Sequence, residues 1–185
     1  MSKYSDYKGN VVVVGGGAAG NNIVRSLSAK LDGSKYNLIL VNARPYSIHM
    51  LAGARITTTD EGHLEDTAFI PYDKIFVNGN GSLRVGKVVA IDATNGSQGG
   101  VLTLQDGGKL PYDILVLAPG SVWGGAVAFP DDKDEVNDWL KQWRNKYKKA
   151  NHIVVAGGGA VGIETAGELR DQFPVGSLTI LRHLF

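Results

Sequence analysis

Two short runs of consecutive apolar residues stand out along the chain, and each runs directly into a cluster of glycines. Residues 11–14 read VVVV and residues 153–156 read IVVA. Continuous apolar runs of this length are typical of strands that are buried on both faces of a parallel sheet. A second apolar run follows each of them after an intervening segment, at residues 36–41 and 178–181. The pattern therefore predicts two pairs of neighbouring parallel strands.

The segment between the two strands of each pair has the spacing of a helix. In residues 18–31, the side chains of Ile23, Leu27 and Leu31 recur every four residues and form one apolar stripe. Residues 161–172 take the corresponding place in the second pair. A strand, a helix and a parallel strand make one β-α-β unit, so two such units are predicted, each with a right-handed crossover.

A third amphipathic helix is predicted at residues 135–149, just before the second unit. Its apolar face carries Val136, Trp139, Leu140, Trp143 and Tyr147. This face favours a helix packed at a domain junction over one that binds a membrane surface or a partner helix. Residues 122–134 are rich in glycine, proline and aspartate and are interpreted as a linker. The linker would divide the chain into a first domain, residues 1–121, and a partial second domain, residues 135–185.

The region between the two units has a different pattern of apolar and polar residues. Residues 84–91 and 101–104 are separated by a glycine-rich turn and predict antiparallel strands. Residues 112–117 form another apolar run typical of a buried strand, whereas residues 42–75 show no regular pattern. The predicted fold class is therefore α/β, with Rossmann-like parallel sheet units and an antiparallel β meander.

Both glycine clusters match the pattern G-x-G-x-x-G. The first glycine allows a tight turn, the second lets the backbone approach a pyrophosphate, and the third lets the helix pack closely on the strand. The free N–H groups and the dipole at the start of the helix favour the phosphate charge. One such motif is a weak signal, because glycines also permit a plain strand–helix turn, but two in this context predict two dinucleotide sites. The candidate nucleotide-binding residues in the motifs are Gly15, Gly17, Ala18, Ala19, Gly20, Gly157, Gly159, Ala160, Val161 and Gly162.

The position at the end of the second predicted strand departs from the usual motif. Such units carry Asp or Glu there to accept the ribose hydroxyls, but this chain has Asn42. An amide offers no charge-assisted hydrogen bond to a ribose. Arg44, two residues further along the chain, has the charge to meet the 2′-phosphate of NADP. Asn42 and Arg44 are therefore candidate cofactor-binding residues, and both FAD and NADP stay open as ligands of the first unit.

In the second unit, Arg182 and His183 stand where NAD-binding units usually place an acid. A guanidinium group at this position suits the 2′-phosphate of NADP, and a solvated arginine at a strand end is an equal alternative. The pattern slightly favours NADPH over NADH. Glu164 falls near the start of the predicted helix. There its carboxylate either stabilises the helix through the positive end of the helix dipole or lies near the nicotinamide.

Composition and charge limit the chemistry that is expected. The chain has no cysteine, which excludes a disulfide framework, a thiolate metal site and a redox-active dithiol. His49 and His63 have no partners at metal-ligand spacing, so no metal is expected, and no nucleophile motif identifies a catalytic residue. The net charge of +1 gives no reason to expect nucleic acid as a partner. The polar N-terminus and the lack of a bilayer-length apolar run favour a cytoplasmic protein without a transmembrane segment.

Three stretches, taken in order, resemble a known family. They are GGGAAG near the N-terminus, LPYDILVLAPGS at residues 110–121 and GGGAVGIETAGEL at residues 157–169. Together they resemble flavoproteins of the pyridine nucleotide-disulfide oxidoreductase type, and more narrowly their apoptosis-inducing-factor-like and ferroptosis-suppressor-like branch. The resemblance implies an FAD-binding-type domain at residues 1–121 and part of an NAD(P)H-binding-type domain at residues 135–185. It also implies an oxidoreductase that passes hydride from NAD(P)H by way of FAD to a quinone-like acceptor.

The same matching implies residues near the flavin. Val88 and Val89 lie where the family contacts adenine through the backbone, and Ala118, Pro119 and Gly120 replace its Ala-Thr-Gly segment. Members of the family are longer, so the chain is expected to be a fragment of one or a natural truncation. The alternative function is a non-catalytic nucleotide-binding or interaction module that has lost its flavin. An uncovered edge in the second sheet would also favour self-association.

Overall fold

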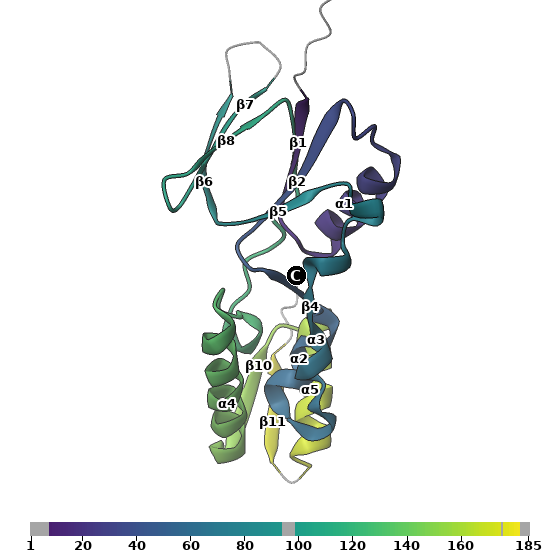
Figure 1. The fold of residues 1–185 in the computed structure, drawn as a ribbon. Helices are drawn as coiled ribbons and strands as arrows, with labels where there is room; N and C mark the ends of the chain where they lie inside the picture. The colour runs from purple at the N-terminus through teal and green to yellow at the C-terminus, as the bar shows by residue number, and fades with distance from the viewer. Residues whose placement is uncertain (1–7, 94–98, 175, 182–185) are drawn as a thin grey trace, which may run out of the picture. The chain divides into compact units, whose positions relative to one another are not determined.

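The computed structural model describes residues 8–93, 99–174 and 176–181, and the chain divides into two compact units (Figure 1). Unit 1 comprises Met1–Ser47 and Ile70–Ser121, and unit 2 comprises Ile48–Phe69 and Val122–Phe185. This division differs from the boundaries expected from sequence, because residues 48–69 join unit 2 and the expected linker belongs to unit 2 as well. Local sequence pattern does not reveal which core a short segment joins, so this part of the division could not be predicted.

A parallel sheet forms the centre of unit 1, with its strands in the order β5-β2-β1-β9. The elements are β1 Gly9–Val14, α1 Ala18–Lys30, β2 Tyr36–Asn42, β5 Ser82–Val85 and β9 Ile114–Leu117. The pairings of β1 with β2, β1 with β9 and β2 with β5 are all parallel. Because β1 lies between two strands and is covered on both faces, Val11, Val12 and Val13 are almost fully buried.

Different layers cover the two faces of this sheet. Successive side chains of a strand point to opposite faces, so Val11 and Val13 pack with Val24 of α1, while Val12 packs with Leu102 and Leu104. These leucines belong to the antiparallel ribbon of β6 Val88–Ala93, β7 Gly100–Leu104 and β8 Lys109–Tyr112. The predicted fold class, with a Rossmann-like unit and an antiparallel meander, is confirmed.

The strand predicted at residues 84–91 is wrong as a single antiparallel strand. Its first part belongs to β5, which pairs in parallel with β2, and its second part belongs to β6. The break falls at Gly86, whose N–H donates to the carbonyl oxygen of Asn42 over 2.8 Å. A Cβ at Gly86 would lie 3.2 Å from the Leu104 side chain, so the chain changes sheets where the ribbon packs closely.

The segment that showed no regular pattern consists of short elements. They are β3 Tyr46–Ile48, η1 Met50–Ala52, α2 Gly53–Thr58, η2 Glu61–His63, α3 Glu65–Ala68, β4 Phe69–Pro71, η3 Tyr72–Lys74 and η4 Val77–Gly79. Elements of this length hold too few residues for a helical or alternating period to be visible. Their side chains still enter the cores, since Ile56 is fully buried in unit 2 and Tyr72 is buried in unit 1.

Unit 2 contains the second β-α-β unit. Its elements are η5 Gly125–Val127, α4 Lys133–Lys149, β10 His152–Ala156, α5 Ala160–Gln172 and β11 Ser177–Leu181, and β10 pairs in parallel with β11. Asp132 caps α4 by accepting hydrogen bonds from the N–H groups of Asp134 and Glu135. The apolar face of α4 packs through Val136 and Leu140 against Ile56 and Phe129. Residues 122–134 therefore contribute to a core.

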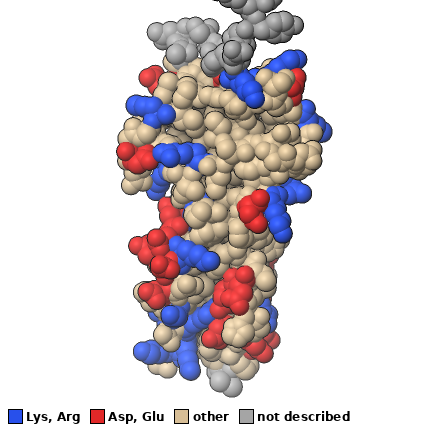
Figure 2. Space-filling view, viewed as in Figure 1, with Lys and Arg blue, Asp and Glu red and all other residues tan. Residues whose placement is uncertain are grey.

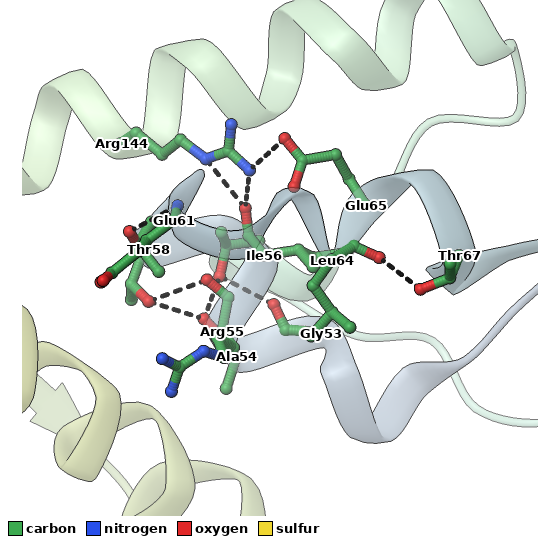
Figure 3. Close-up of polar contacts among 12 residues, drawn as sticks. Gly53, Ala54, Arg55, Ile56, Thr58, Glu61, Leu64, Glu65, Thr67 and Arg144 are labelled. Carbon is green, nitrogen blue, oxygen red and sulfur yellow. Dashed lines mark hydrogen bonds and ion pairs between the residues drawn. The ribbon is translucent and has the colours of Figure 1, made fainter.

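Within unit 2, two ion pairs join α2 and α3 to α5 and α4, and Figure 3 shows the one between Arg144 and Glu65. Arg144 of α4 donates to the Ile56 carbonyl oxygen from Nε over 3.0 Å and from Nη2 over 2.8 Å, and Nη2 lies 3.0 Å from Oε1 of Glu65. Both charged side chains are only 17% exposed. Arg55 of α2 pairs with Glu168 of α5 at 3.1 Å. Arg144 therefore donates to one oxygen of a carboxylate and to a backbone carbonyl where the short helix α2 ends against α4.

Replacing Arg144 by methionine is expected to lower the free energy of unfolding of unit 2 by about 2 kcal/mol. The loss leaves the Glu65 carboxylate and the Ile56 carbonyl oxygen half-buried without their donor. The matched control is Arg84→Met in unit 1, because the Arg84–Asp106 pair is about half exposed at both ends. Exposed pairs contribute ~0–1 kcal/mol. Urea unfolding curves of the two variants compare the costs, and equal costs would contradict this role for Arg144.

Acidic and basic side chains are interspersed on the face shown in Figure 2, and neither sign covers that face alone. This distribution agrees with the net charge of +1. Among the described residues, no helix combines the length and the apolar character needed to cross a membrane.

Candidate functional site

The two glycine motifs form loops of the same construction at the ends of β1 and β10. Gly15 has φ +104° and Gly157 has φ +122°, a backbone region that residues with a Cβ rarely adopt. A Cβ on Gly20 would collide with the carbonyl oxygen of Gly15, and a Cβ on Gly162 would collide with that of Gly157. The first and last glycines of each motif are therefore required by the fold itself.

The middle glycine of each motif faces open space. No described atom lies within 4 Å of a Cβ built on Gly17 or on Gly159, and both residues cap their helices with extended backbone. Ala18, Ala19, Ala160 and Val161 begin the two helices, where the first N–H groups lack partners within the helix. Each loop thus leaves room, in front of free N–H groups, for a group with the size and charge of a pyrophosphate.

Ala118 lies beside the first loop. Its N–H donates to the carbonyl oxygen of Val14 over 2.8 Å, and a Cβ on Gly15 would collide with the backbone of Ala118. Pro119 and Gly120 follow at the surface, and Gly120 has φ +73°. The structure therefore brings the end of β9 to the first glycine loop, as the parallel pairing of β1 and β9 requires.

The other predicted residues are more scattered. Val88 begins β6 and is partly buried against the core that contains Leu102 and Leu104, whereas Val89 is 58% exposed. β6 begins two residues after Gly86, whose N–H donates to the Asn42 carbonyl oxygen. Glu164 is exposed on α5. Arg182 follows the last residue of β11 and lies, with His183, outside the described residues.

Asn42 contacts the first loop directly. The Gly16 N–H donates to Oδ1 of Asn42 over 2.9 Å, and Nδ2 of Asn42 donates to the Arg44 carbonyl oxygen over 2.9 Å. On the other side of Gly16, the hydroxyl of the buried Tyr72 donates to the Gly16 carbonyl oxygen. Tyr72 is the residue that sequence reasoning missed. It lies 56 positions from Gly16 in a segment without pattern, so no local signal could have found it.

Burial raises the pKa of Tyr72 to about 12, although the Ser47 hydroxyl and the Arg44 charge lower it. Because this pKa is higher in the folded chain than its ordinary value of 10.0, the folded chain holds the phenolic proton more tightly than the unfolded chain. The protonated Tyr72 hydroxyl therefore contributes to the free energy of unfolding. This contribution is complete below about pH 10 and is lost as the pH rises towards about 12. The hydroxyl is therefore a constant donor to the loop at neutral pH.

Unit 1 is expected to lose stability between about pH 10 and about pH 12 in urea unfolding experiments. The Tyr72→Phe variant should lack this part of the loss, because it has no proton to release. Burial also raises the pKa of Tyr147 in unit 2, so Tyr147→Phe is the matched control. If Tyr72→Phe showed the same alkaline loss in unit 1 as the unmodified chain, the Tyr72 assignment would be wrong.

A groove of about 970 Å³ lies beside the second loop, within unit 2. β10 and the motif from Gly157 to Gly162 form part of its lining, together with Trp123, Trp143 and Lys146. The Lys146 ammonium group lies 4.4 Å from the centre of the Trp143 ring. Sequence reasoning placed Trp143 on the packed face of its helix, but not beside a nucleotide loop.

Comparison with known proteins shows where this arrangement belongs. Residues 9–180 match the family model described as pyridine nucleotide-disulphide oxidoreductase. The chain belongs to this family. The match spans both glycine loops, the antiparallel ribbon and almost all of β11. Membership of the pyridine nucleotide-disulphide oxidoreductase family implies the use of FAD and NAD(P)H.

Individual relatives agree with this assignment. An FAD-dependent oxidoreductase of Flammulina velutipes is 44% identical over 123 residues, which are 66% of this chain and 38% of the relative. Ferroptosis suppressor protein 1 of Taeniopygia guttata is 35% identical over 175 residues, 94% of this chain and 43% of the relative. The sulfide:quinone oxidoreductase structure from Aquifex aeolicus shares the fold, with a TM-score of 0.65 at 20% identity over 94% of this chain and 43% of that chain. The chain thus spans about two fifths of the length of these two relatives and of this structure.

Proposed function

We propose that this chain is the nucleotide-binding portion of an FAD- and NAD(P)H-dependent oxidoreductase. The first glycine loop takes the pyrophosphate of FAD, and the second takes that of NAD(P)H. The observation that supports this proposal is the shared construction of the two loops. In each loop the outer glycines are required by backbone geometry, while the middle glycine faces open space at the start of a helix.

The chain supplies binding and orientation. At the first loop, the N–H groups at the start of α1 and the positive end of the helix dipole hold the pyrophosphate. The backbone of Ala118 closes one side of this loop. At the second loop, the groove beside Gly157 and Gly159 offers an apolar and aromatic wall that excludes water from a bound nucleotide.

Among the described residues, no group of His, Asp and Glu could hold a metal ion. The chemistry would come from the cofactors, since a bound flavin accepts hydride from a nicotinamide and passes the electrons to a second acceptor. We propose a quinone-like molecule as that acceptor, in keeping with the sulfide:quinone oxidoreductase that shares the fold.

The proposal is tested by adding FAD to the purified chain and removing free flavin by gel filtration. Retained visible absorbance that NADPH bleaches in the absence of oxygen supports an oxidoreductase. Retained flavin that NADPH does not bleach supports binding at the first loop but counts against the second. A colourless chain that FAD cannot reconstitute counts against the proposal and favours a nucleotide-binding module without flavin.

We further propose that the second loop prefers NADPH, because Arg182 directly follows β11 in the sequence. A guanidinium–phosphate contact is strong and geometrically specific. Replacing Arg182 by alanine is then expected to weaken NADPH binding by about 1.5–3 kcal/mol and to leave NADH binding nearly unchanged. Calorimetric titration of both nucleotides measures the difference. Equal losses for the two nucleotides would remove the preference for NADPH.

A further inference from the structure

Gly16, the residue between the first two glycines of the motif, is fixed from both sides. Its N–H donates to Oδ1 of Asn42, and its carbonyl oxygen accepts from the Tyr72 hydroxyl. A Cβ on Gly16 would collide with that hydroxyl and would lie 3.1 Å from Cγ of Asn42. Gly16 itself is buried, whereas Gly17 next to it is exposed. The N–H and the carbonyl oxygen of Gly16 are therefore both held by hydrogen bonds, directly before Gly17, which faces open space.

The orientation of the Asn42 amide is determined by its partners. A backbone N–H can only donate and a backbone carbonyl can only accept. The atom of Asn42 that faces Gly16 must therefore be the oxygen, and the atom that faces the Arg44 carbonyl must be the nitrogen. An aspartate in the same place would keep the first contact but would set a carboxylate oxygen against the Arg44 carbonyl oxygen. This position calls for one acceptor and one donor, which an amide provides and a carboxylate does not.

We propose that Asn42 and Tyr72 are positioning residues that clamp Gly16 and so hold the first glycine loop in the shape that receives a pyrophosphate. In this role Asn42 is not a weakened ribose acceptor, because the family's acid would disturb the turn that Asn42 stabilises. The consequence for nucleotide binding rests on the proposed function of the first loop. The clamp itself is present in the chain without a nucleotide.

Amide resonances of the isotopically labelled full chain test the clamp and the binding separately. Without nucleotide, Asn42→Ala is expected to speed solvent exchange of the Gly16 amide by about tenfold, because one hydrogen bond is lost. The control is Asn37→Ala, near the start of the same strand, where the exposed amide donates to Asn10. Gly16 exchange should be unchanged in this control. If Asn42→Ala also left Gly16 exchange unchanged, the clamp would be refuted.

ADP, which contains the pyrophosphate, is then titrated into the same samples. The dissociation constant reported by the Gly17 amide should rise about five- to tenfold in Asn42→Ala and in Tyr72→Phe. The Gly159 amide in the second loop should report no change in either variant. A loss of equal size at Gly159 would indicate general destabilisation and would overturn the positioning role.

Asn42→Asp separates the clamp from a ribose-binding role. The clamp predicts faster Gly16 exchange and weaker ADP binding at neutral pH, with recovery towards about pH 4, where a protonated carboxyl can donate to the Arg44 carbonyl. Arg44 is the charged group near this position, Tyr72 stays protonated because burial raises its pKa, and Arg84 on β5 is paired with Asp106. Tighter ADP binding by Asn42→Asp would show a ribose acceptor and overturn the proposal.

The two proposals fail in different ways. If ADP shifted no amide resonance of the first loop, the proposed function of that loop would be refuted, and the clamp would have no role in binding. The exchange rate of Gly16 would still decide whether Asn42 and Tyr72 hold the loop. If ADP bound but the variants bound it as tightly as the unmodified chain, the first loop would keep its function and the clamp would be overturned.

Discussion

Replacing Gly17 by valine is expected to abolish nucleotide binding at the first loop while leaving the fold intact. The backbone of Gly17 is extended, with φ −85°, so a valine adopts it without strain. No described atom lies within 4 Å of the added Cβ, so the side chain enters open space. That space is where the proposed pyrophosphate lies against the N–H groups of α1. We expect the dissociation constant for ADP at this loop to rise at least about 100-fold, the effect of losing two or more charge-assisted hydrogen bonds.

Gly159→Val is the matched control, because Gly159 occupies the same motif position, with φ −79° and equally open space. Each variant should lose ADP binding at its own loop and keep it at the other. Thermal unfolding followed by circular dichroism should give nearly the same midpoint for both variants and the unmodified chain. Retained ADP binding at the first loop of a natively folded Gly17→Val chain would reject the proposed role of that loop.

The parts of the fold that could be predicted are those set by nearby residues. The run at residues 11–14 is a strand whose core residues are buried because apolar layers cover both faces of its sheet. The run at residues 153–156 also forms a strand, but the prediction that it is buried on both faces is wrong, because among the described strands β10 pairs only with β11 and Val154 is 53% exposed. The glycines after both strands are required by local backbone geometry. α4 was predicted for the same kind of reason, since its apolar side chains recur with helical spacing, and Val136, Trp139 and Leu140 pack in one core. Motif and period are short-range signals, and these elements depend on short-range contacts.

The parts that could not be predicted depend on distant partners. β5 joined the parallel sheet because β2 offered it an edge, and a strand of four residues does not show in its sequence which edge it will meet. Residues 48–69 joined unit 2 through Ile56 and the Arg144 network, both 79 or more positions from their partners on α4. At the candidate site, Asn42 was predicted to be a cofactor-binding residue, but this prediction rested only on the acid that the usual motif carries at this position. Its donor and acceptor partners became visible only when the loop and the strand end were placed together.

Replacing Gly15 by alanine is expected to lower the free energy of unfolding of unit 1 by about 2–6 kcal/mol, the sum of two parts. One part is conformational, because φ +104° is strained for any residue with a Cβ, at about 1–3 kcal/mol. The other part is steric, because the new Cβ would collide with the carbonyl group of Ala118 at the end of β9. That atom belongs to the backbone, so β1 and β9 must separate, and overpacking of this kind costs about 1–3 kcal/mol.

Gly120→Ala isolates the conformational part within the same unit. Gly120 also has a positive φ, +73°, but no described atom lies within 4 Å of its added Cβ. Gly17→Ala has neither strain nor collision and should change stability by less than about 0.5 kcal/mol. Urea unfolding should therefore give the lowest free energy of unfolding for Gly15→Ala, a much higher one for Gly120→Ala and the highest for Gly17→Ala. If Gly15→Ala cost no more than Gly120→Ala, β9 would not press on the loop. The backbone of Ala118 could then not be the wall that closes the first nucleotide site.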